Sequence, residues 1–195
     1  MTATPLVPGT LIGESFGRET GARDRAGPPA RQARKQRALR AWWAKTAAAF
    51  GPASPARAIH HGAGVPLFRL LGFTPIDVSL RVAPGHVAAL ALTRRATRVA
   101  IVTTAWNAAS HGAWRSAVAT ATRAGVAWCL VFDGVSIGAV DASRPFARRQ
   151  VSVTLPVAAG EEAGFDVLWA LFRADRFDQA RDGSPLDRLV AAASR

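Results

Sequence analysis

One apolar stretch, Gly125–Ala142 (GVAWCLVFDGVSIGAVDA), constrains the fold of this chain more than any other segment. Its first half, AWCLVF, is a continuous apolar run with the length of a buried strand. Asp133-Gly134 follows and is typical of a tight hairpin turn, after which VSIGAVDA returns. The stretch therefore predicts a hairpin in the central part of a covered sheet.

The flanking segments supply further strands and helices. IDVSLRV alternates, HVAALAL and RVAIVTTAW are rich in Val and Ala, and RQVSVTLPV alternates again, so each predicts a strand. Ser110–Ala124 places Trp114, Val118 and Ala121 on one side of a helix, which Gly125 ends. We expect an α/β (α+β) fold with a central mixed sheet of about five strands flanked by helices.

Helical segments are expected at both ends of the chain. Arg31–Phe50 carries an apolar stripe that includes the pair Trp42-Trp43, which favours core packing over a base-stacking surface. Phe165–Phe172 has helical spacing, and Ser184 is typical of a helix cap. We therefore expect a flexible basic arm at 1–30, an α/β domain with a helical lead-in at 31–160, and a C-terminal helical segment or connector at 161–195.

Positive charge is concentrated in the first part of the chain. The formal net charge is +12, and between Arg25 and Phe132 the sole acidic residue is Asp77. Such an excess favours a polyanion as partner, with nucleic acid first. Nearly all basic residues are Arg in an Ala-rich chain, which is also typical of a GC-rich genome. Charge alone therefore leaves nucleic-acid contact and compositional bias equally open.

The same sequence bears on location. Cys129 is the one cysteine, so no disulfide forms within the chain. No run of 18 apolar residues occurs, and the N-terminus lacks a basic region followed by a long apolar core. We expect a cytoplasmic protein with no membrane partner.

The order helix, Gly125, Trp128-x-Leu130-x-x-Asp133-Gly134 and return strand resembles the back half of the restriction-endonuclease-like (PD-(D/E)xK) fold. In particular, it is similar to the N-terminal modules of bacterial restriction–modification proteins that carry an adenine-specific DNA methyltransferase further on. Phe132 stands where those modules usually have Thr. The tail Leu168–Val190 also resembles the segment before the methyltransferase. The resemblance covers roughly residues 35–190 and implies DNA and a methyltransferase domain or subunit as partners.

The resemblance fails at the catalytic residues. That nuclease site needs one acidic residue and then acid-x-Lys on the next strand, so that two carboxylates hold Mg²⁺. Asp77 is the one candidate for the first position, but HVAALAL and RVAIVTTAW contain no Asp, Glu or Lys. His60 and His61 have no acidic or Cys neighbour in sequence, which favours a surface or packing role over a metal site. No methyltransferase motif or Gly-rich cofactor loop is present, so we expect no catalytic site, metal or cofactor in this chain.

Three functions remain open. The first is a degenerate nuclease-like module that holds DNA, working with a methyltransferase that this chain does not contain. The second is a Mg²⁺-dependent nuclease with a rearranged site made from Asp77, Asp133 or Asp141. The third is an interaction fragment that docks on a partner through its C-terminal amphipathic helices. For the first, phosphate contacts are expected from two clusters of arginines, Arg23, Arg25, Arg31, Arg34 and Arg37, and Arg94, Arg95 and Arg98.

Overall fold

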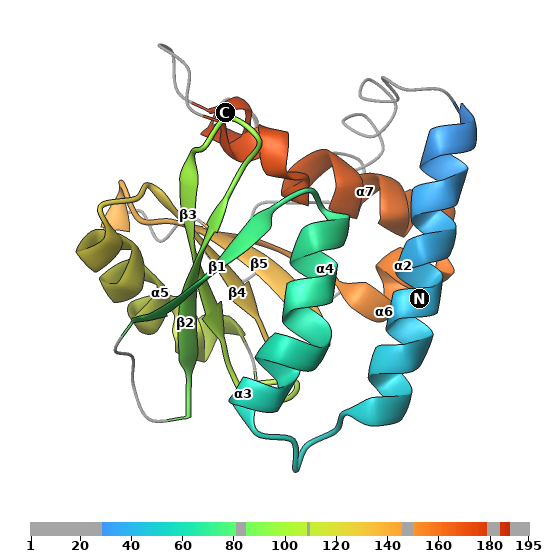
Figure 1. The fold of residues 1–195 in the computed structure, drawn as a ribbon, viewed down its shortest axis with the longest axis horizontal. Helices are drawn as coiled ribbons and strands as arrows, with labels where there is room; N and C mark the ends of the chain where they lie inside the picture. The colour runs from blue at the N-terminus through green and yellow to red at the C-terminus, as the bar shows by residue number, and fades with distance from the viewer. Residues whose placement is uncertain (1–28, 81–84, 109, 146–149, 179–183, 188–195) are drawn as a thin grey trace.

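The computed structural model describes residues 29–80, 85–108, 110–145, 150–178 and 184–187, which fold as a six-stranded sheet with helices on both faces (Figure 1). The predicted α/β class is confirmed, with six strands in place of about five. The strands lie side by side in chain order: β1 (Thr74–Leu80), β2 (Val87–Leu92), β3 (Arg98–Thr103), β4 (Trp128–Phe132), β5 (Ser136–Asp141) and β6 (Gln150–Thr154).

One parallel pair joins two antiparallel halves of the sheet. Strands β1, β2 and β3 pair antiparallel, as do β4, β5 and β6, whereas β3 and β4 run parallel with Ala100 opposite Cys129. A parallel pair needs a crossover connection, and helix α5 (Ser110–Ala124) supplies it. The predicted bounds of this helix are confirmed.

Helix α5 covers one face of the sheet with small side chains. Ala113, Ala117 and Ala121 are buried there against a cluster that includes Val102 and Cys129. Cys129 is fully buried, and desolvation by burial raises the pKa of its thiol. Short Ala side chains thus make the fully buried contacts of α5, and Trp114 adds a partly buried aromatic side chain to the same cluster.

All the other helices in the described residues cover the opposite face. They bury the large side chains of the core, among them Phe68, Trp128, Phe132 and Phe165. Their bounds are α2 (Pro29–Ala49), α3 (Ala56–Ile59), the π-helical turn η1 (His60–Gly64), α4 (Val65–Leu70), α6 (Leu155–Gly160), α7 (Glu162–Phe172) and the 3₁₀ turn η3 (Ala174–Phe177).

The C-terminal segment belongs to this same core. Phe165, Leu168 and Phe172 of α7 are buried in one cluster with Leu39 of α2, and Leu186 joins them. At the start of the last helical turn, Ser184 Oγ accepts a hydrogen bond from the Asp187 backbone N–H at 3.1 Å, which is the capping role expected of this serine. Residues 161–178 and 184–187 thus pack as part of the sheet domain.

Two predicted boundaries are corrected. The predicted last strand, RQVSVTLPV, ends at Thr154, because Leu155 and Pro156 begin α6 with proline in its first turn. The hairpin turn lies one residue later than expected: Asp133 N–H donates to Ser136 O at 3.3 Å, so Gly134 and Val135 are the central residues. Gly134 has φ 85°, a conformation that glycine adopts without strain.

The tryptophan pair packs against the core, as predicted. Trp42 Nε1 donates to Ala63 O at 3.0 Å, and Trp43 stacks on Trp106 with ring centroids 6.4 Å apart. Trp106 in turn lies directly against Gly134, where an added Cβ atom would approach within 2.4 Å of its ring. The β4–β5 turn is therefore held between the sheet and an aromatic stack.

Within the described ranges, no helix is long and apolar enough to cross a membrane. The basic arm predicted at 1–30, with Arg23 and Arg25, lies outside the described residues except for the start of α2.

Gly134→Ala should lower the free energy of unfolding by about 2–4 kcal/mol, because it combines backbone strain at positive φ with a clash against Trp106. Gly125→Ala is the matched control: φ is 64° but nothing lies within 4 Å, so strain alone should cost about 1 kcal/mol. Urea denaturation measures both losses. Equal losses in the two variants would contradict the proposed packing of Trp106.

Candidate anion-binding pocket

A pocket of about 290 Å³ lies where the start of α2, the end of α4, the β2–β3 turn and the α7–η3 junction meet. Four of its lining residues are basic and one is acidic: Arg31, Lys35, Arg94, Arg173 and Asp175. These residues are as much as 144 positions apart in sequence, so only the fold assembles them. The pocket therefore brings together basic side chains that are widely separated in the sequence.

Helix α2 places two of the cations. It begins at Pro29, and Arg31 and Lys35 lie four residues apart, hence on the same side of the helix. The helix is fixed by long-range hydrogen bonds: Gln32 Nε2 donates to Asp166 Oδ1 at 2.6 Å, and Arg40 Nε donates to Ala159 O at 2.9 Å. Because no acidic residue lies in the first turn of α2, its backbone dipole adds to the positive charge.

The β2–β3 turn places the third cation. Thr93 N–H donates to Thr97 O at 3.0 Å, and Thr93 Oγ1 accepts from the Thr97 N–H at 3.1 Å. The turn closes with Ala96 at φ 59°, which leaves Arg94 and Arg95 exposed at its tip. Both arginines sit on a short, internally hydrogen-bonded turn, and Arg94 lines the pocket.

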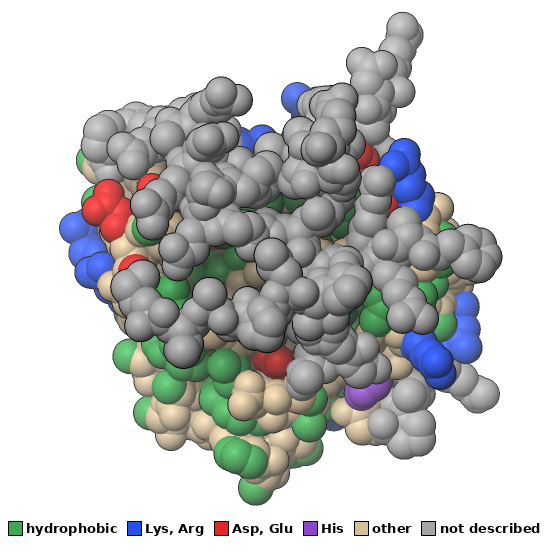
Figure 2. Space-filling model, turned by 180° about the vertical axis from the view of Figure 1, so that it is seen from behind, with side chains coloured by type: hydrophobic (Ala, Val, Ile, Leu, Met, Phe, Trp, Pro, Cys, Tyr) green, Lys and Arg blue, Asp and Glu red, His purple; other side chains and the backbone are tan. Residues whose placement is uncertain are grey.

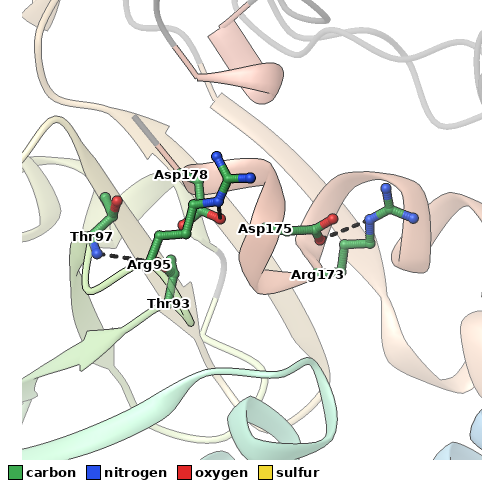
Figure 3. A network of polar contacts seen from close by, with 6 residues as sticks. All are labelled: Thr93, Arg95, Thr97, Arg173, Asp175 and Asp178. Carbon is green, nitrogen blue, oxygen red and sulfur yellow. Dashed lines mark hydrogen bonds and ion pairs between the residues drawn. The ribbon is translucent and has the colours of Figure 1, made fainter. Parts of the chain in front are cut away.

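The α7–η3 junction places the fourth cation beside the one acid. Ala174 N–H donates to Leu71 O at 2.9 Å, which ties this junction to the end of α4. Arg173 Nε lies 2.8 Å from Asp175 Oδ1, and Arg95 Nε lies 3.9 Å from Asp178 Oδ2 (Figure 3). Arg173 is thus partly neutralised within the pocket.

Lys35 lies at the centre of this electrostatic arrangement. Its Nζ is 3.8 Å from the ring centroid of Trp169, which also stacks on Phe165. Burial lowers the pKa of Lys35 below the ordinary value, and the positive charges of Arg94 and Arg31 lower it further. Like charges are therefore close enough to repel one another when no anion is bound.

The structure brings together parts of both predicted arginine clusters. Arg31 and Arg94 line the pocket, whereas Arg34 and Arg37 are exposed on α2 and are not among the lining residues. Arg98 is exposed at the first position of β3, and Arg95 is 80% exposed beside Asp178. Seen from behind, the described Lys and Arg side chains lie at the margins and form no single patch (Figure 2).

Sequence reasoning missed Lys35, Trp169 and Arg173. Trp169 lies within Phe165–Phe172, whose apolar residues at helical spacing predicted a helix, and Arg173 follows the last residue of that helix, α7. Lys35 could have been found from its position four residues after Arg31, because residues at that spacing share a helix face. No local signal connects Arg173 with the start of α2.

The three acidic residues considered for a rearranged Mg²⁺ site, Asp77, Asp133 and Asp141, lie far from one another. Asp133 accepts hydrogen bonds from the N–H groups of Val135 and Ser136, and Asp141 accepts from Ser143 N–H at 3.0 Å. Asp133 lies opposite Ser136, the first residue of β5, and Asp141 is the last residue of β5, so the two acids are about 16 Å apart at roughly 3.3 Å per residue. An ion bound at about 2.1 Å cannot bridge them.

Asp77 is equally remote from that hairpin. It lies in β1 at the far edge of the sheet, three strand spacings or about 14 Å from β4, and its side chain lies outside what the structure describes.

Burial raises the pKa of Asp133, although hydrogen bonds from Ser136 and Val135 oppose this. Asp133 therefore acts as the turn residue that the sequence predicted.

The neighbouring histidines are also accounted for by packing. His60 is buried, with Nδ1 2.8 Å from Thr103 Oγ1, and its ring meets His61 edge-on at 5.2 Å between centroids. Among the residues described, no group of three or more His, Cys, Asp or Glu side chains is placed to hold a metal ion.

Comparison with protein-family models, with curated proteins and with solved structures found no match to this chain. The pocket must therefore be interpreted from its own residues.

Lys35→Met should raise the melting temperature of the free protein by about 1–2 °C at low salt, since partly exposed charges interact weakly and Met keeps the contact with Trp169. A lowered folded-state pKa means that the protonated lysine opposes folding. Wild-type stability should therefore rise with pH through that lowered pKa and up to 10.5, which narrows the difference between the two proteins. Thermal denaturation between pH 7 and pH 10 checks this, and a variant less stable than wild type at pH 7 would contradict it.

Proposed function

We propose that this chain is a non-catalytic module that binds DNA by holding backbone phosphate in the basic pocket. The observation that carries the proposal is the convergence of Arg31, Lys35, Arg94 and Arg173 from three separate parts of the chain on one small concave site. Cations that repel one another in the free protein gain most from an anion that neutralises them.

The chemistry of these side chains fits phosphate. A guanidinium group presents parallel N–H donors that match two phosphate oxygens, and lysine adds a point charge. The pocket offers one accessible carboxylate, Asp175, which is already paired with Arg173. Contacts of this kind position a backbone and read no sequence, so binding should depend steeply on salt and little on base order.

The place of this module in a restriction–modification system rests on the sequence resemblance. In its favour, α5 leads through Gly125 into β4, and Asp133-Gly134 stands at the following turn. The distances between Asp77, Asp133 and Asp141 favour a degenerate nuclease-like module over a rearranged Mg²⁺ site. The partner we propose is an adenine-specific DNA methyltransferase, as a further domain or a separate subunit.

Docking through the C-terminal helices has less support. Phe165, Leu168 and Phe172 are buried in the core, and Trp169 is engaged by Lys35 and Phe165. Val157 is the one exposed large hydrophobic residue in the described part of the chain. A stable protein interface usually needs a larger apolar centre than one side chain.

Replacing Arg31 and Arg94 together by Gln should weaken binding to a short DNA duplex about 10–100-fold at 0.1 M salt, because two phosphate contacts and their counterion release are lost. The slope of log K against log salt should fall by about 2. Fluorescence anisotropy across a salt series, in the presence of Mg²⁺, measures both quantities, and the recovered DNA shows whether any strand is cut.

The matched control replaces Arg57 and Arg115, two exposed arginines on α3 and α5 that do not line the pocket, by Gln. It removes the same net charge and should change affinity far less. Equal losses in the two double variants would refute the pocket as the binding site, and DNA cleavage by the wild type would refute the non-catalytic assignment.

A further inference from the structure

The charge balance of the pocket exceeds what one internal phosphate needs. Among the described lining residues, four cations face one carboxylate, and Asp175 is 55% exposed while it pairs with Arg173. A phosphodiester in a continuous strand carries a single negative charge, whereas a terminal phosphate monoester carries about −1.5 to −2 at pH 7. A dianion also has three unesterified oxygens, which more of the four cations can contact at once.

The shape of the site points in the same direction. Its volume of about 290 Å³ is at the lower limit of small-molecule sites, so one phosphate group with part of its sugar fits inside while the rest of a duplex lies outside. A phosphate within a continuous strand is esterified to a sugar on both sides, whereas a terminal phosphate is esterified on one side only. A terminal phosphate can therefore turn more of its oxygens toward the cations of the pocket.

The interior offers no surface for a base. Among the described residues, Trp169 is the one aromatic side chain that lines the pocket, and its ring is already contacted by Lys35 and stacked on Phe165 with centroids 5.8 Å apart. Base–aromatic stacking would have to displace one of these contacts. The described lining therefore suits a phosphate group and its sugar better than a base.

We infer that the pocket recognises a terminal phosphate monoester at the end of a DNA strand in preference to internal phosphodiesters. This inference rests on the proposed DNA-binding function and makes it more specific. The cations Arg31, Lys35, Arg94 and Arg173 supply the recognition.

The test compares four probes in the same buffer: blunt duplexes of one sequence that carry a 5′-phosphate, a 3′-phosphate or hydroxyl groups at every end, and free dAMP. Wild-type protein should bind one of the phosphorylated duplexes about tenfold more tightly than the hydroxyl duplex. Arg94→Gln should reduce that preference to near unity, whereas Arg115→Gln, on the far face of the sheet, should preserve it.

Each other result has a distinct meaning. Equal affinity for all three duplexes overturns the inference and leaves the proposed DNA binding intact, whereas no binding to any duplex overturns both. A preference that survives Arg94→Gln places end recognition outside the pocket and overturns the assignment. If dAMP binds as tightly as the phosphorylated duplex, the ligand is a free nucleotide and the inference about strand ends is wrong.

Arg94 is exposed on a turn whose hydrogen bonds are made by Thr93 and Thr97, so Arg94→Gln should fold normally. Its unfolding transition, measured beside that of wild type, verifies this. Arg31→Gln, on a different element, provides a second variant that should lose the same preference.

Discussion

The parallel pairing of β3 with β4 is the constraint on which the rest of the architecture depends. It requires a crossover, and α5 makes that crossover over one face of the sheet. The remaining helices of the described residues lie on the opposite face, so that α2 and α7, which are far apart in sequence, contribute to one core cluster that includes Leu39, Phe165 and Phe172. The pocket is a consequence of this crowding, because it forms where the ends of those helices meet the β2–β3 turn.

Local sequence patterns predicted the elements well and their junctions less well. Helix α5 has the predicted bounds, and the apolar run before Asp133 is a fully buried strand, because 3.6-residue and continuous apolar patterns are strong signals. The strand expected through Val157 ends at Thr154, since Leu155 and Pro156 suit a first helical turn as well as a strand end. The hairpin turn differs from the prediction by one residue, because its central residues are Gly134 and Val135 in place of Asp133 and Gly134.

The sequence predicted two of the four cations of the candidate site. Arg31 and Arg94 stood out because each lies in a basic cluster, but nothing local relates either of them to Arg173 or to Trp169. Such relations depend on tertiary contacts, for example that of Ala174 with Leu71. Burial lowers the pKa of Lys35, and the positive charges of Arg94 and Arg31 lower it further, so holding this lysine charged in the pocket opposes folding. Like charges that are held together at a cost in stability are typical of functional sites, where binding of the ligand offsets that cost.

The burial of Cys129 makes the rate at which its thiol is alkylated a measure of how often the domain opens. The thiol is the only one in the chain and belongs to the second residue of β4, in the cluster that α5 covers. Burial holds it in the protonated, unreactive form. Alkylating reagents can therefore reach it only when α5 separates from the sheet or the whole domain opens. The rate of its labelling reports the frequency of that opening, without an introduced probe, at the parallel strand pair that organises the fold.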